Sequence, residues 1–105
     1  MVKQFEVYLI NLDESISDDP KNSRPGVVIS PDEMNRNLGH AIIAPIASSN
    51  AEYPTRIPTN FLNAERRVIL DQMRTVDSKR LVKKIGEIDK DSAKAVLQLL
   101  QEMFA

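Results

Sequence analysis

Arg24 and Pro25 lie where a polar segment, residues 13–23, gives way to an apolar segment, residues 26–29. Proline disfavours the helical conformation of the residue before it, so we expect Arg24 in extended backbone at the mouth of a strand. A guanidinium presents five donors in a fixed fork, keeps its charge and can bind a phosphate through two hydrogen bonds. The placement indicates a phosphate-binding arginine, and it also suits a structural arginine that pairs with a neighbouring carboxylate such as Asp19.

Two further polar groups follow predicted strands. Residues 71–75 read Asp-Gln-Met-Arg-Thr at the end of one strand, and the hydroxyls of Ser48 and Ser49 follow the end of another. Carboxylates and arginines at such a place can satisfy one another as the start of a helix, and hydroxyls at a strand end commonly close a turn. Taken alone, each group therefore has a structural explanation as well as a functional one.

The amino-acid composition excludes several classes of protein and of functional site. Of the 105 residues, 42% are hydrophobic and 28% are charged, which excludes wholesale disorder and predicts one domain over residues 1–105. The chain has no cysteine and a single histidine, His40, so it offers no disulfide, thiol nucleophile or multi-histidine metal cage. We expect His40 to be structural.

Charge and hydropathy bear on partners and location. The net charge is −1, unlike that of a strongly basic nucleic-acid binder, so any contact with a nucleic acid must come from local clustering of cations. Apolar runs are too short to span a bilayer, and the first twelve residues are too polar for a signal sequence. The expectation is a cytoplasmic protein that makes no membrane contact.

The elements that must position the polar groups follow from the hydropathy pattern. Alternating or β-branched segments predict strands at residues 5–12, 26–29, 41–46, 54–58, 67–71 and 81–88. Pro45 indicates that the latter part of the third strand lies at a sheet edge or at a bulge, because proline lacks the N–H that a central strand needs.

Two helices and a single helical turn complete the pattern. Ser30 as a cap, with Glu33 as its partner in a capping box, predicts a short helix, and residues 77–80 predict a single helical turn capped by its first residue. The last segment carries apolar residues at helical spacing behind Asp89 or Asp91 as the cap. Six strands, a small inserted helix and a longer terminal helix predict an α+β domain built on a strongly curved antiparallel sheet.

Six strings of the sequence are together similar to one family. They are residues 7–13, 24–35, 42–45, 53–56, 70–77 and 79–86. In this order they resemble the MazF/PemK family of toxin endoribonucleases from type II toxin–antitoxin modules. The most specific pair of strings is Arg24-Pro25 with Asp71-Gln72-x-Arg74-Thr75, and the likeness covers nearly the whole chain.

This resemblance implies a small SH3-like β-barrel of the CcdB/MazF type, with the short inserted helix and the C-terminal helix, working as a homodimer. It also implies sequence-specific cleavage of single-stranded RNA without a metal or other cofactor. In that reaction the ribose 2′-hydroxyl attacks the adjacent phosphate and leaves a 2′,3′-cyclic phosphate and a 5′-hydroxyl. The implied effect is inhibition of translation and growth, restrained by a cognate antitoxin whose tail occupies the RNA groove.

The resemblance also assigns residues. It implies Arg24 as the phosphate-binding arginine, Ser48 as the hydroxyl residue and Asp71 as the catalytic carboxylate. The family's hydroxyl position itself falls on Ala47, and the PemK branch has an arginine where this chain has Ile69. The residues implied to contact RNA are Asp19, Lys21, Asn22, Arg56, Gln72 and Arg74.

Two other interpretations stay open at this stage. A CcdB-like protein that poisons gyrase by binding would share the fold, but it would have no need of the arginine and aspartate strings. A homologue with weak or no catalysis that still binds an antitoxin is suggested by Ala47 at the hydroxyl position.

Overall fold

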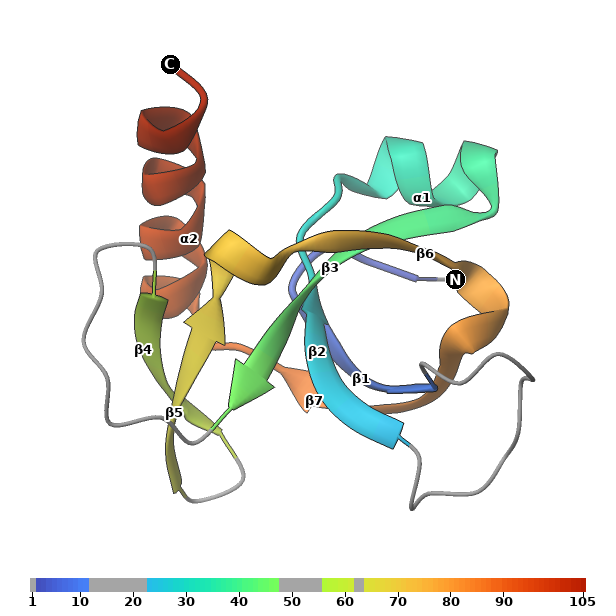
Figure 1. Ribbon diagram of the computed structural model, residues 1–105, viewed down its shortest axis with the longest axis horizontal. Helices are drawn as coiled ribbons and strands as arrows, with labels where there is room; N and C mark the ends of the chain where they lie inside the picture. Colours follow the sequence, from blue (N-terminus) through green and yellow to red (C-terminus); the bar gives the residue numbers. More distant parts are fainter. Residues whose placement is uncertain (1, 12–22, 48–55, 62–63) are drawn as a thin grey trace.

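The computed structural model of the chain describes residues 2–11, 23–47, 56–61 and 64–105. In chain order the elements are β1 (Glu6–Asn11), β2 (Ser23–Val28), α1 (Asp32–Leu38), β3 (His40–Ala47), β4 (Arg56–Phe61), β5 (Ala64–Ile69), the 3₁₀ turn η2 (Leu70–Gln72), β6 (Arg74–Asp77), the 3₁₀ turn η3 (Ser78–Arg80), β7 (Leu81–Glu87) and α2 (Lys90–Met103). Figure 1 shows α2 beside β4 and β5, with α1 lying away from it near β3.

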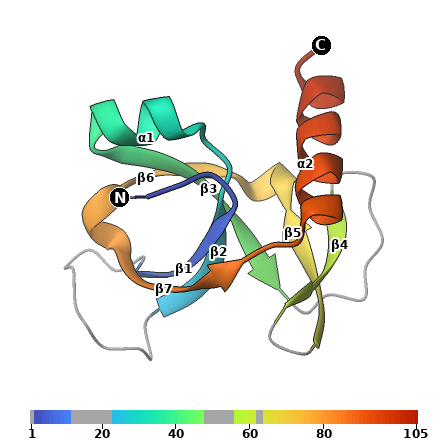
Figure 2. The same cartoon turned by 180° about the vertical axis from the view of Figure 1, so that it is seen from behind.

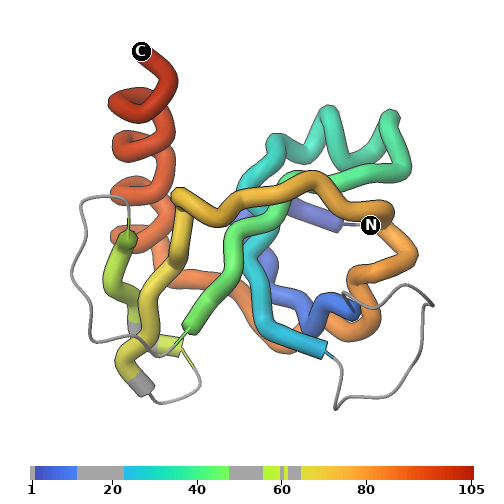
Figure 3. Tube along the Cα trace, viewed as in Figure 1, coloured from blue at the N-terminus to red at the C-terminus, as the bar shows by residue number. Residues whose placement is uncertain are grey.

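The seven strands form one antiparallel sheet. Its order is β4-β5-β3-β2-β1-β7, and β6 pairs with β3 outside this path. β3 is the shared strand: it pairs with β6 through residues 40–43 and with β5 through residues 46–47. The tube of Figure 3 shows β3 running through the middle of the molecule. Among the described strands β6 and β7 are not paired with each other, so hydrogen bonding leaves the sheet open there.

Each face of the sheet covers its own apolar core. One core contains Val7, Val27, Ala44 and Val68 and is covered by the apolar side of α2, whose Val96 is fully buried. The second core lies on the other face and consists of Ile10, Val28, Ala41, Ile43 and Val76. Neighbours such as Val27 and Val28 enter different cores because side chains alternate along a strand. Burial of each such side chain stabilises the fold by roughly 1.5–3 kcal/mol.

The α+β class and the antiparallel sheet are confirmed, but the described residues form seven strands where about six were expected. The missed strand is β6, in which Val76 is the one buried residue. Its sequence, Arg-Thr-Val-Asp, lacks an apolar pattern, and it becomes a strand because it pairs with β3. The segment before it also differs, because Asp71 lies in the 3₁₀ turn η2 rather than at the end of a strand.

The sequence indicated a sheet edge or a bulge at Pro45; the edge is wrong, because Pro45 lies in the central strand β3. It lies opposite Gly26 of β2. On the other side of β3 the pairing with β6 ends at Ile43 and the pairing with β5 begins at Ile46. A proline is tolerated in this central strand because it falls where one partner strand is exchanged for the next.

The capping box expected at α1 is wrong. Pro31 is the N-cap residue, and no side chain caps the helix. The Ser30 hydroxyl instead donates to the Asn35 side chain and accepts from the N–H of Ile42 at 3.0 Å. Ser30 therefore fastens α1 to β3 from a buried position. The other two expected caps are confirmed: Asp77 accepts from Lys79 N–H, and Asp89 accepts from Ser92 N–H.

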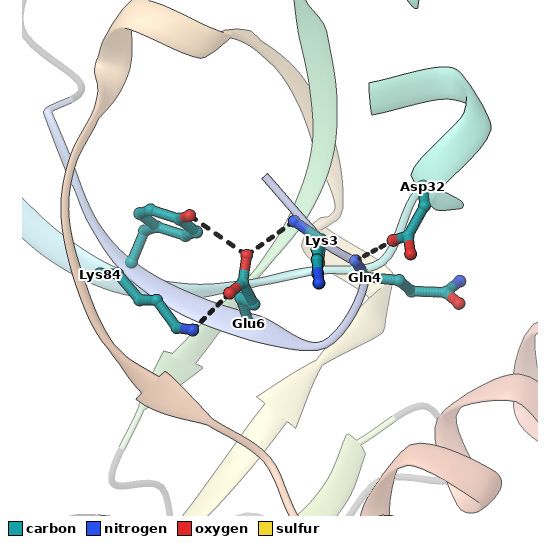
Figure 4. Close-up of polar contacts among 6 residues, drawn as sticks. Lys3, Gln4, Glu6, Asp32 and Lys84 are labelled. Atoms are coloured by element: carbon teal, nitrogen blue, oxygen red, sulfur yellow. Dashed lines mark hydrogen bonds and ion pairs between the residues drawn. The ribbon is translucent and has the colours of Figure 1, made fainter. Parts of the chain in front are cut away.

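A charged cluster around Glu6 ties β7 and the segment before β1 to the sheet. Figure 4 shows the Glu6 carboxylate between the ammonium of Lys84 and the backbone N–H of Lys3, and the hydroxyl of Tyr8 also donates to it. Burial alone would raise the pKa of the Glu6 carboxyl. The hydrogen bonds from Lys84 and Lys3, with the charge of Lys84, outweigh burial and lower this pKa below its ordinary value.

The cluster lies beside a bulge in the pairing of β1 with β7. Residues Val7 and Tyr8 of β1 face Gly86 and Lys84 of β7, so β7 has one extra residue at this point. Such a bulge leaves one residue outside the ladder. The Glu6–Lys84 ion pair lies beside the bulge and adds a side-chain contact between β1 and β7 there. Figure 2, the view from behind, shows β1 and β7 running side by side here.

Gly86→Ala should lower the free energy of unfolding by about 1–3 kcal/mol. The φ angle of Gly86 is 153°, and a Cβ there would lie 2.9 Å from the Phe61 ring. The matched control is Gly39→Ala, since Gly39 also has a positive φ but has open space around it. Urea denaturation should show a larger loss for Gly86→Ala, and equal losses would contradict the proposed clash.

Glu6→Gln should reduce stability in a pH-dependent way. Because folding lowers the pKa of Glu6, its carboxylate stabilises the fold above its ordinary pKa of about 4.5. This contribution is lost as the pH falls through the lowered value. Unfolding free energies from about pH 7 down to about pH 2 should show a difference between wild type and variant that vanishes at the acid end. In a Lys84→Gln background the difference should shrink; a difference independent of pH would contradict this account.

Candidate functional site

A pocket of about 280 Å³ opens on the face of the sheet that carries the second core. It is lined by Ile10, Arg24, Pro25, Ile43, Pro45, Gln72 and Arg74. These residues come from β1, β2, β3, η2 and β6, so the pocket exists only when the sheet is assembled. Three of the residues predicted from the sequence, Arg24, Gln72 and Arg74, are brought together here.

Strand register explains why these residues meet. Ile10 lies opposite Arg24 across β1 and β2, and Ile43 lies opposite Arg74 across β3 and β6. Directly opposed residues project from the same face of a sheet. The two arginines are thus each paired with an isoleucine of the second core, and the charged groups stand at the margin of an apolar surface.

Gly26 makes the floor of the pocket possible. A Cβ at this position would lie 2.5 Å from Ile10 Cδ1 and 3.3 Å from the carbonyl oxygen of Ala44. The absence of a side chain lets Ile10 lie across β2, where it joins Pro25, Ile43 and Pro45 in lining the pocket. Nothing in the sequence distinguishes these four apolar residues as a pocket lining, because only the strand register brings them together.

Arg24 adopts the extended conformation that its proline neighbour predicts. It lies in β2 and is exposed, and its Nη1 donates to the carbonyl oxygen of Ser23 at 3.0 Å. The start of β2 therefore presents the guanidinium at the pocket as a charged, solvent-accessible group. That placement suits the recognition of an anion that arrives from solvent.

Arg56 and Asp71 form a second group next to the pocket. The Arg56 Nε atom and the Asp71 Oδ1 atom are 3.6 Å apart. Asp71 does not itself line the pocket, but it directly precedes Gln72, and Gln72 does line it. The family resemblance implied that Asp71 is catalytic and that Arg56 contacts RNA. The structure pairs these two side chains with each other.

The remaining predicted site residues lie outside the described residues. They are Asp19, Lys21, Asn22 and Ser48. Ala47, at the position of the family's hydroxyl residue, is half-buried at the end of β3 opposite Arg67. It follows Pro45 by two residues and so lies on the same face of β3 as the pocket.

His40 is exposed and its Nδ1 atom lies 2.8 Å from the carbonyl oxygen of Leu38, which fits the expected structural role.

The chemistry of the pocket favours an anionic, partly apolar ligand. Two guanidiniums can neutralise a phosphate, and the apolar residues beside them reduce screening by water, which strengthens the attraction. Of the described residues that line it, none carries a carboxylate. Within the described ranges, no three His, Cys, Asp or Glu residues are gathered where they could hold a metal ion. The described helices are also too short or too polar to cross a membrane.

A larger pocket of about 480 Å³ lies between β4, β5 and α2, and its residues serve the fold. It is lined by Pro58, Thr59, Glu65, Asp89 and Ser92. Asp89 caps α2, and the side chains of Thr59, Ser92 and Asp89 hydrogen-bond to one another at 2.6–3.1 Å. These bonds, from Ser92 first, lower the pKa of Asp89. The side chains of Thr59, Asp89 and Ser92 thus satisfy one another.

The amino-acid sequence matches a known protein family and individual relatives. Residues 3–104 match the family described as PemK-like, MazF-like toxin of type II toxin-antitoxin system. The chain is 30% identical to Endoribonuclease EndoA of Bacillus subtilis over 96% of its own length and 92% of that protein's. It is 29% identical to Endoribonuclease MazF9 of Mycobacterium tuberculosis over 84% of its length and 83% of that relative's.

Solved structures show the same fold. A MazE-MazF crystal structure from Deinococcus radiodurans superposes with a TM-score of 0.80 at 21% identity, covering 99% of this chain and 95% of that one. A mycobacterial endoribonuclease in complex with its cognate antitoxin superposes with a TM-score of 0.82 at 15% identity, covering 99% and 95% of the two chains. The likeness extends over both faces of the sheet and both helices.

Proposed function

The chain belongs to the PemK-like, MazF-like toxin family of type II toxin–antitoxin systems, and we propose that it is an endoribonuclease that cleaves single-stranded RNA. The single observation that carries this proposal is the pocket in which Arg24, Arg74 and Gln72 meet beside an apolar floor. Two cations suit a phosphodiester, and an amide with an apolar surface suits the nucleobase next to it.

In the proposed reaction the 2′-oxygen of a ribose attacks the adjacent phosphorus. The bond from phosphorus to the 5′-oxygen breaks, which leaves a 2′,3′-cyclic phosphate and a 5′-hydroxyl. The proton lost from the 2′-hydroxyl and the proton gained by the 5′-oxygen balance, so no cofactor or metal is consumed. The enzyme must move these protons and stabilise the extra negative charge on the pentavalent phosphate.

Arg24 is the proposed ligand of the scissile phosphate. Its guanidinium stands at the pocket, so it can donate hydrogen bonds to the negative charge that develops on the phosphate. Asp71 is the proposed proton acceptor, since it is the carboxylate nearest in sequence to the pocket-lining Gln72. Ser48 is proposed to supply the hydroxyl that Ala47 lacks.

RNA recognition is proposed to use the rest of the pocket and its surroundings. A nucleobase can stack on Pro25 and Pro45, and the amide of Gln72 can hydrogen-bond to its edge. Arg74 adds a second phosphate contact. Asp19, Lys21 and Asn22 precede β2 in sequence and are proposed to contact the flanking nucleotides.

The assembly is proposed from the relatives. A mycobacterial endoribonuclease has been solved with its cognate antitoxin, and MazF of Deinococcus radiodurans with MazE. We propose that this chain likewise acts as one toxin domain that is inhibited by a cognate antitoxin. The further elements of this proposal are a homodimer, an SH3-like barrel as the finer description of the curved sheet, and action on mRNA in the cytoplasm.

Ala47 favours one alternative, an antitoxin-binding homologue with little catalysis. The residue stands on the pocket side of β3 where the family has a hydroxyl. The CcdB-like interpretation has less support, because the family match and both endoribonuclease relatives favour cleavage over gyrase binding.

Arg24→Ala should reduce the rate of RNA cleavage at least about 100-fold, the usual loss when a donor to the transition state is removed. Purified protein is incubated with a mixed-sequence RNA in EDTA, and the product ends are analysed for cyclic phosphate and 5′-hydroxyl groups. Arg36→Ala on exposed α1 is the matched control and should cleave at the wild-type rate. Unchanged cleavage by Arg24→Ala would contradict the assignment, and intact RNA with wild-type protein would favour the inactive homologue.

Ser48→Ala should slow cleavage by about 10-fold or less, because Ser49 or a water molecule can replace one neutral hydrogen bond. The same product assay measures it, under single-turnover conditions. A loss as large as that of Arg24→Ala would show instead that the hydroxyl of Ser48 is indispensable.

A further inference from the structure

Arg56 reaches beyond the strand next to it to meet Asp71. In the β4–β5 ladder Arg56 lies opposite Ile69, the last residue of β5. Asp71 lies two residues further along the chain, in η2. The 3.6 Å contact between the Arg56 Nε atom and the Asp71 Oδ1 atom therefore joins the first residue of an edge strand to the turn that follows its neighbour.

The turn that Arg56 holds is the one that enters the pocket. η2 contains Asp71 and Gln72, and Arg74 begins β6 immediately afterwards. Gln72 and Arg74 both line the pocket. The turn is closed at its end by a backbone hydrogen bond of 3.2 Å from Met73 N–H to the carbonyl oxygen of Leu70. A constraint on Asp71 is thus transmitted over one to three residues to two groups of the pocket.

The two side chains of the pair differ in exposure. That of Arg56 is 16% exposed and that of Asp71 is 39% exposed. A guanidinium that is mostly covered presents little of its surface to a phosphate, whereas the carboxylate remains accessible to an incoming ligand. Partial burial of Arg56 also reduces the screening of the pair by water, which strengthens the attraction between the two charges.

We propose that Arg56 is a positioning residue for RNA cleavage, acting through the Asp71 carboxylate rather than by contacting RNA. This inference rests on the proposed function, and it replaces the expectation that Arg56 binds RNA directly. Arg56 fixes the orientation of the carboxylate at the edge of the pocket and, with it, the path of the turn that carries Gln72 and Arg74. The cation that positions the Asp71 carboxylate therefore comes from β4.

A double-mutant cycle tests the pair. Cleavage of one RNA is measured for wild type, Arg56→Ala, Asp71→Asn and the double variant, with kcat and KM determined separately. Asp71→Asn should lower kcat about 100-fold, as for loss of a general base. Arg56→Ala should lower kcat about 10-fold with little change in KM, within the range by which contacting residues couple. The double variant should be no slower than Asp71→Asn, and Arg56→Lys should recover part of the rate.

A matched control separates this role from a general effect on the hairpin. Arg66 lies in β5, and its Nε donates to the carbonyl oxygen of Phe61 at 2.9 Å. Arg66→Ala should leave kcat unchanged, even if urea denaturation shows a loss of stability equal to that of Arg56→Ala.

Three results would overturn the inference while leaving the proposed function standing. A rise in KM with unchanged kcat for Arg56→Ala would make Arg56 an RNA contact. Multiplicative losses in the double variant would mean that the two residues act independently, and wild-type rates for Arg56→Ala would remove any role. A wild-type protein that cleaves no RNA would contradict the proposed function itself, and the inference with it, which distinguishes that failure from the other three.

Discussion

The pairing of Ile10 with Arg24 across β1 and β2 is the contact on which the rest of the site depends. It places a permanently charged group directly beside a fully buried apolar side chain. Gly26 permits the arrangement, because any larger residue there would meet the end of Ile10. A shift of this register by one residue would turn Arg24 to the opposite face, where α2 covers the other core.

β3 extends this constraint to the rest of the pocket. It pairs with β2, β5 and β6, and Pro45 falls where its partner changes. The exchange leaves room for η2, which leads from β5 into β6 and brings Gln72 and Arg74 to the pocket. Catalytic groups need a scaffold that fixes their positions before the substrate arrives. In this fold the two apolar cores supply that scaffold, and the charged residues occupy its margin.

The sequence predicted the features that depend on local chemistry. Pro25 predicts the extended Arg24, and the apolar spacing with Asp89 predicts α2, because each signal acts over a few residues. β6 could not be predicted, since Val76 is its only buried residue and pairing with β3 makes it a strand. The apolar floor and the contact between Arg56 and Asp71 were also missed, because both join residues that only the register brings together. Ser30 failed as a cap because its hydroxyl found partners in Asn35 and Ile42.

The most direct test of this account is a structure of the protein bound to an RNA oligonucleotide with a 2′-deoxy nucleotide at the cleavage position, which cannot be cut. We expect the guanidinium of Arg24 within hydrogen-bond distance of both non-bridging oxygens of the scissile phosphate, with the neighbouring base against Pro25 and Pro45. A scissile phosphate held elsewhere on the protein, with Arg24 turned to a carboxylate, would contradict it.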